Sequence, residues 1–185
     1  MKKRIAKHIK NQDFVKVYIT NTDDYEIDHF NGIIYEQNDK FILMCDTFDF
    51  NFDGFIVLRK SDISEIKCTE NEKIFKQIID NERITNSITK KRLAINVTLS
   101  AFKEMFIQLM YLKLPIIIEC KYGKDDRFQI GPICEVDEKK VKLKHFNASG
   151  EFDLKPTTAR YKEITFFRID SPYANIFYKY AKEIE

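Results

Sequence analysis

The 185-residue chain has no tryptophan and only five glycines. So few glycines leave little scope for loops that cradle phosphate, and neither a G-x-x-x-x-G-K-[ST] nor a G-x-G-x-x-G pattern occurs. Long apolar runs are also missing, because the longest, residues 114–118, is far short of the ~20 residues that a membrane-spanning helix needs. We therefore expect neither a nucleotide-binding fold of those classes nor a membrane protein.

Cysteine is scarce as well. The four cysteines lie far apart in the sequence, unlike the regularly spaced pairs of small secreted domains. The basic residues 1–13 are not followed by the apolar stretch of a signal peptide. No two histidines or cysteines have metal-ligand spacing. We expect free thiols and a cytoplasmic protein, and we predict no metal site and no cofactor.

The charge of the chain is close to balanced. Lysine and arginine number 31 against 29 aspartates and glutamates, a formal net charge of +2. Such a balance gives no general attraction to nucleic acid or to an anionic membrane.

Alternating apolar residues dominate the first part of the chain, from Phe14 to Ile66. This period of two residues is typical of strands with one buried face. Clusters of Asp, Asn and Gly interrupt it and predict turns. The expected strands are Val15–Ile19, Phe30–Tyr35, Phe41–Met44, Phe55–Leu58 and Ile63–Lys67.

Helical spacing follows. Ile74, Phe75, Ile78 and Ile79 recur at helical intervals, and Thr69 with Glu72 has the form of a capping box. A second apolar stripe predicts a helix from about Phe102 to Met110, after a basic stretch at 84–92 and a short extended piece at 93–97. Ser171-Pro172 predicts the start of a C-terminal helix.

The alternating pattern then returns in the same order. Residues 32–43 align with residues 131–143, each with a glycine-led strand, an acidic turn and a further strand. Residues 61–66 align with residues 159–164 at nearly the same offset. The sequence therefore predicts an internal duplication.

Each copy, a bent five-strand unit with a glycine in its second strand and an acidic turn after it, resembles the Sm-like (LSm-like) barrel. The second copy is also similar to a bacterial family without an assigned activity, through Ile130–Ile133, Val141–Asp153 and Tyr161–Phe166. The Sm resemblance implies RNA binding and ring assembly. Neither the Arg-Gly nor the Lys-Gly pair of Sm proteins occurs in the chain.

The expected fold class is mainly β (α+β), with two tandem Sm-like five-stranded barrels, a connecting helical segment and a C-terminal helix. Exposed edges of short strands would favour pairing with another copy or with a partner protein. The expected boundaries are an N-terminal basic segment at 1–13, a first barrel at 14–68, a connector at 69–113, a second barrel at 114–170 and a helix at 171–185.

Two loops are candidates for ligand or partner contact. The 145–153 segment gathers His145, Asn147 and Asp153 near a glycine, and Arg160 follows it. These residues would form a polar lip at a barrel mouth, or simply a hairpin that bonds its own backbone. In the first copy, Phe48 and Phe50 lie in an acidic loop and would either anchor a partner protein or alternate into the core.

Lys90, Lys91 and Arg92 form the main candidate for nucleic-acid contact, and a solvated linker explains them equally well. Because only seven of the 31 basic residues are arginine, RNA recognition is the second hypothesis. The first is a non-catalytic binding or scaffold module that acts through protein contacts or self-association. An enzyme built on the 145–153 hairpin is the third, and no catalytic residue is assigned.

Overall fold

The computed structural model describes residues 2–20, 29–120 and 128–183, and it separates into two compact units. The first spans Met1–Leu99 and the second Ser100–Glu185. Their boundary lies inside the segment 69–113, so the helices expected as a connector are divided between the two units. Residues 21–28 and 121–127 lie outside the described residues.

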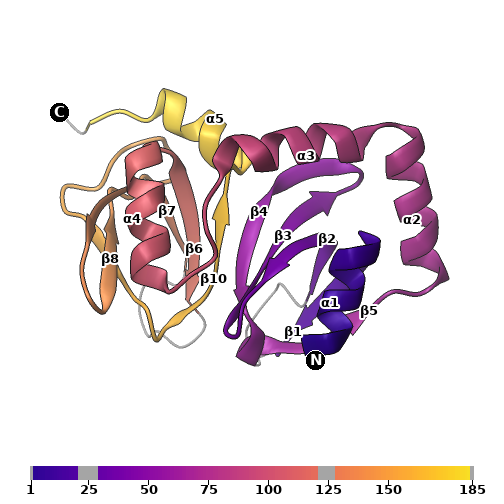
Figure 1. Ribbon diagram of the computed structural model, residues 1–185. Coiled ribbons are helices and arrows are strands. Elements are labelled where there is room, and N and C mark those ends of the chain that lie inside the picture. Colours follow the sequence, from indigo (N-terminus) through magenta and orange to yellow (C-terminus); the bar gives the residue numbers. More distant parts are fainter. Residues whose placement is uncertain (1, 21–28, 121–127, 184–185) are drawn as a thin grey trace. The chain divides into compact units, whose positions relative to one another are not determined.

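The first unit contains five antiparallel strands and three helices in its described residues (Figure 1). Helix α1 has buried Ile5 and His8 on one face, which packs against β2. The strands lie where the sequence pattern predicts them, although β3 is buried continuously from Phe41 to Thr47. The elements are α1 (Lys2–Asn11), β1 (Phe14–Ile19), β2 (His29–Gln37), β3 (Phe41–Phe48), β4 (Asn51–Arg59), the 3₁₀ turn η1 (Lys60–Asp62), β5 (Ile63–Lys67), α2 (Glu70–Asn81) and α3 (Ile84–Ile95).

The second unit repeats the pattern of five antiparallel strands and adds two helices. Helix α4 packs on β7 and β8 through Phe102, Met105, Phe106 and Leu109, four residues of the predicted stripe. Helix α5 packs on β6 and β7. The elements are α4 (Phe102–Leu112), β6 (Pro115–Cys120), β7 (Phe128–Val136), β8 (Lys140–Leu143), β9 (Thr157–Arg160), β10 (Ile164–Ile169) and α5 (Pro172–Tyr180).

The prediction of two closed Sm-like barrels is wrong, because the strands form an open antiparallel sheet. The strand order is β5-β1-β2-β3-β4 in the first unit and β10-β6-β7-β8-β9 in the second. In neither order are the two end strands hydrogen-bonded neighbours, as closure would require. Alternation reports which face of a strand is buried, and that is the same for an open and a closed sheet.

Helix α3 was also predicted wrongly, as a basic stretch followed by an extended piece. Its apolar residues do not form a single stripe, and only Ile88 and Ile95 are buried. Arg83, with a left-handed φ of 58°, separates α3 from α2. The helix therefore lacks the periodic signal from which a sequence pattern predicts a helix.

Glycine permits a very close approach of backbones in both units. A Cβ at Gly32 would lie 2.0 Å from the carbonyl oxygen of Cys45, and a Cβ at Gly131 would lie 2.0 Å from that of Lys144. Just beyond each glycine the pairing with the next strand shifts register, at Ile34/Glu36 and at Ile133/Glu135. These features recur in both units at positions that the sequence aligns. The origin of the units by duplication stays a prediction.

None of the helices in the described residues combines the length and the apolar character that crossing a bilayer requires.

Alanine at either close-approach glycine should destabilise its unit strongly. We expect Gly32→Ala and Gly131→Ala each to lower the free energy of unfolding by about 3 kcal/mol, because backbone must move to admit the methyl group. Gly150→Ala is the matched control: its φ is 75° but its nearest contact is at 3.7 Å, so about 1 kcal/mol should be lost. Urea unfolding measures all three, and equal losses would contradict the steric explanation.

Candidate partner-binding groove

The β3–β4 hairpin ends in a tight turn that places aromatic side chains at its tip. Phe48 pairs with Asn51, and the two turn residues between them, Asp49 and Phe50, have φ angles of 44° and 65°. Two-residue turns with positive φ at both positions favour Asn-Gly, so a phenylalanine in the second position is strained. The Asn51 side chain donates a hydrogen bond to the carbonyl of Asp49 at 3.0 Å and helps to hold the turn.

Helix α2 meets this hairpin through stacked rings. The Phe50 and Phe75 rings stack at a centroid distance of 4.8 Å, and Phe75 also stacks on Phe14 of β1 at 5.6 Å. Phe48 differs from Phe50 in the same turn, because 71% of the surface of Phe48 is exposed. The alternative that these aromatics alternate into the core therefore fails for Phe48.

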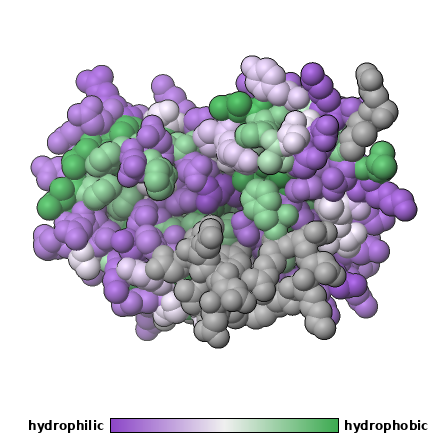
Figure 2. All heavy atoms as spheres, turned by 180° about the vertical axis from the view of Figure 1, so that it is seen from behind, coloured by the Kyte–Doolittle hydropathy of each residue, from purple (hydrophilic) through white to green (hydrophobic). Residues whose placement is uncertain are grey.

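A groove of about 340 Å³ lies between the hairpin, β1 and α2. Hydrophobic side chains gather at the left edge of Figure 2, the side on which α2 lies when Figure 1 is turned around. Ile74, 53% exposed, adds to the apolar surface of the groove. The lining residues are Phe14, Lys16, Asn31, Thr47, Phe48, Asp49, Asn71, Glu72, Ile74 and Phe75.

Carboxylates outnumber cations on the walls of the groove, with Asp49 and Glu72 against Lys16. Burial alone would raise the pKa of Glu72, but hydrogen bonds from Thr69 and the charge of Lys16 bring it below its ordinary value. Glu72 accepts from the Thr69 backbone N–H at 2.7 Å and from its hydroxyl at 2.5 Å, which confirms the predicted capping interaction. Glu72 is therefore an anion at neutral pH, fixed at the start of α2.

The 145–153 segment is a hairpin that bonds to itself. The side-chain oxygen of Asn147 accepts from the backbone N–H groups of Ser149 and Glu151, at 2.9 and 3.1 Å. His145 Nδ1 accepts from the N–H of Ile130 at 3.0 Å, and its carbonyl accepts from the N–H of Asp153 at 2.9 Å. These bonds account for the His145 and Asn147 side chains without a ligand. His145, Asn147 and Asp153 do not line the groove beside α2.

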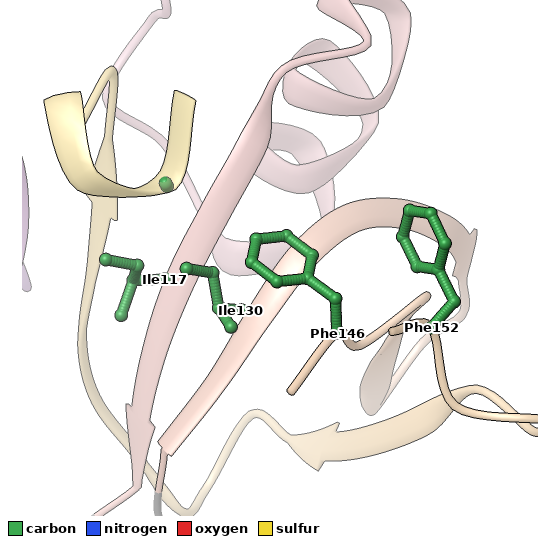
Figure 3. Close-up of a cluster of buried hydrophobic side chains, with 5 residues drawn as sticks. Ile117, Ile130, Phe146 and Phe152 are labelled. Carbon is green, nitrogen blue, oxygen red and sulfur yellow. The ribbon is translucent and has the colours of Figure 1, made fainter. Parts of the chain in front are cut away.

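Two aromatic residues show what this hairpin does for the fold. The rings of Phe146 and Phe152, with centroids 6.0 Å apart, pack with Ile117 and Ile130 beneath α5 (Figure 3). The strand-like bridge between Glu151 and Lys182 ties the hairpin to the chain after α5. The hairpin thus covers one side of the core of the second unit.

Arg160 lies apart from that hairpin, on a larger hollow of about 830 Å³ in the second unit. Arg160 bridges to Glu163 at 3.3 Å, and Tyr161 donates a hydrogen bond to the carbonyl of Asp137 at 2.8 Å. The hollow mixes four basic with two acidic side chains. Its lining is Asp137, Glu138, Lys139, Lys140, Arg160, Tyr161 and Lys162.

The basic cluster at 90–92 lies on α3 of the first unit. Lys90 and Lys91 are exposed, and the Lys91 ammonium lies over the ring of Phe52 at 5.0 Å. Arg92 is largely covered and pairs with Glu36. The structure therefore gives Arg92 an internal ion pair, and it does not bring the cluster to either hollow.

Phe75 and Ile74 are the main residues of the groove that sequence reasoning missed, because their helical spacing was used only to predict the helix α2. Only Ile79 of the four is buried. The four positions span an arc of ordinary width for one apolar face, so the spacing does not tell which part of that face the fold leaves exposed.

Comparisons of the chain with family models, with curated proteins and with solved structures found no match.

Tyr161 should make the stability of the second unit sensitive to alkaline pH. Burial, assisted by nearby carboxylates, raises the pKa of its phenol to about 12, whereas the pKa of a tyrosine in the unfolded chain is about 10. The stabilisation is therefore complete below about pH 10 and is lost as the pH rises towards 12. Tyr161→Phe should flatten this loss.

The measurement is the urea midpoint across that pH range, with Tyr180→Phe as control because Tyr180 is 74% exposed. An unchanged pH profile in Tyr161→Phe would contradict the assignment.

Proposed function

We propose that this chain is a non-catalytic binding module that holds a segment of a partner protein in the groove between the β3–β4 hairpin and α2. The observation that carries the proposal is Phe48, an aromatic residue 71% exposed on the rim of a groove. Large aromatic side chains at the centre of a recognition surface supply much of the binding free energy of protein interfaces.

The chemistry of the groove indicates what the segment carries. Phe48, Ile74 and Phe75 offer apolar contact, and the walls bear two carboxylates against one lysine. An apolar side chain flanked by lysine or arginine complements both features. A second copy of the chain is one possible source of such a segment, and another protein is the other.

We also propose that the chain acts in the cytoplasm. All four cysteines are free, and free thiols fit a reducing compartment.

Phe48→Ser should abolish partner capture without unfolding the chain. A photo-crosslinking amino acid at position 48 would first identify the bound protein in cells, and the affinity of the purified pair would then be measured. Because Phe48 is so exposed, its replacement should change the free energy of unfolding by no more than about 0.5 kcal/mol. We expect the affinity to fall by at least about tenfold, since a recognition anchor contributes about 2 kcal/mol.

Tyr111→Ser is the matched control, because Tyr111 is 78% exposed but lies on α4 of the second unit. It should bind as the unaltered chain does. Equal affinity of all three proteins for the crosslinked partner would contradict the proposal, and light scattering on the same samples separates self-association from binding of another protein.

RNA or nucleotide binding is the second proposal, and the hollow of the second unit favours it. Lys139, Lys140, Arg160 and Lys162 line that hollow and offer phosphate contacts. Tyr161 is less suited to stack on a base, because its ring packs against Phe102 and Phe106, with ring centroids 5.6 and 5.8 Å away.

Binding of a fluorescent single-stranded RNA at low salt tests this second proposal. The double variant Lys139→Glu, Lys162→Glu should weaken it and reduce its salt dependence, whereas Lys90→Glu, Lys91→Glu on the first unit should leave it unchanged. Absence of binding by the unaltered chain at low salt would end the proposal.

A further inference from the structure

Three side chains with metal-binding atoms meet in the first unit, although they come from separate parts of the sequence. His8 lies in the last turn of α1, Asp13 just before β1, and Cys68 between β5 and α2. One donor atom from each, a ring nitrogen, a carboxylate oxygen and a thiol sulfur, lies within 4.8 Å of the other two.

The end of α1 fixes two of these donors together. Gln12, with a φ of 51°, turns the chain back on the helix, so that the N–H of Asp13 reaches the carbonyl of His8 at 3.0 Å. The same turn places a carboxylate oxygen of Asp13 2.8 Å from Nδ1 of His8. The separation of 2.8 Å is that of a hydrogen bond, and it would have to widen by about 0.5 Å for both atoms to bind one tetrahedral zinc ion, whose ligands lie roughly 3.3 Å apart for bonds of 2.0–2.1 Å.

Burial adds an independent indication. The side chain of His8 is only 9% exposed, and its second ring nitrogen, Nε2, is buried with no hydrogen-bond partner among the described residues. A buried polar atom left without a partner is costly, so the hydrogen bond to Asp13 does not by itself account for a histidine at this position. Asp13 remains 26% exposed, which leaves a path from solvent.

A histidine between a carboxylate and a cysteine also suggests a catalytic thiol, but the electrostatics argue against that. Burial raises the pKa of Cys68, and the negative charges of Asp13 and Glu72 raise it further. A nucleophilic cysteine needs the opposite environment, one that favours the thiolate. Negative potential around a thiol instead suits a cation, which displaces the thiol proton to solvent when it binds.

We propose that His8, Asp13 and Cys68 bind one divalent transition-metal ion, zinc in the cell, with water in the fourth position. The donor set of nitrogen, oxygen and sulfur suits zinc rather than magnesium or calcium. The ion would join α1, the start of β1 and the end of β5, and it would hold the chain immediately before α2. Sequence reasoning found no metal site because these residues match no ligand spacing.

Cobalt titration of the full chain, reduced and stripped of metal with a chelator, tests the proposal directly. We expect one equivalent to produce visible d–d bands of tetrahedral cobalt together with a thiolate charge-transfer band, and zinc to displace both. Zinc at about a hundredfold excess over its Kd should raise the Tm of the first unit by roughly 10 °C.

Cys68→Ser should lose the charge-transfer band and bind the metal at least about tenfold more weakly. Asp13→Asn, which keeps the size of the side chain and removes its charge, should also weaken binding. Cys134→Ser is the control, because Cys134 is an exposed thiol of the second unit, and it should behave as the unaltered chain does.

Circular dichroism of each metal-free variant establishes that it is folded before titration. No cobalt bands in the unaltered chain, or bands that survive Cys68→Ser, would overturn the proposal. The result of the cobalt titration is independent of partner binding, because His8, Asp13 and Cys68 do not line the groove between the β3–β4 hairpin and α2.

Discussion

The close backbone contact at Gly32 is the constraint on which the first unit depends. With hydrogen in place of a side chain, β2 can approach the carbonyl of Cys45 in β3, and the pairing then shifts by one residue between Ile34 and Glu36. Any larger residue would force the two strands apart. β3 is buried from Phe41 to Thr47 and emerges only at Phe48, so the position of the exposed hairpin tip follows from how β3 is held.

Much of the strand content could be predicted from the sequence, because alternation is a local property. The strands around Val15, Phe41 and Ile63 lie where the period of two placed them. Closure of the sheet could not be predicted in this way, since it depends on which strands become neighbours. α3 escaped prediction for another reason: with two buried residues along its length, it gives no amphipathic signal.

The candidate sites show why residue type alone is a weak guide to function. Asn147 and His145 attracted attention because amides and imidazoles bind ligands, yet the same groups satisfy buried or turning backbone, which is their role here. Phe48 was singled out with two alternatives, because alternation alone could place it on either face, and the structure exposes it. His8, Asp13 and Cys68 could not be associated from the sequence, because the fold brings the end of α1 and the chain after β5 together across about 60 residues.

Phe48 and Phe50 lie at the same hairpin tip, but packing within the fold explains only one of these two side chains. Positive φ at Phe50 costs about 1–2 kcal/mol, and an aromatic pair contributes about 0.5–1.5 kcal/mol beyond area burial, so its stack on Phe75 offsets most of the strain. The fold therefore explains Phe50. Phe48 is 71% exposed and gains little from folding, while an exposed aromatic ring adds a liability to aggregate. Intramolecular packing does not account for that side chain, whereas the proposed contact with another molecule would.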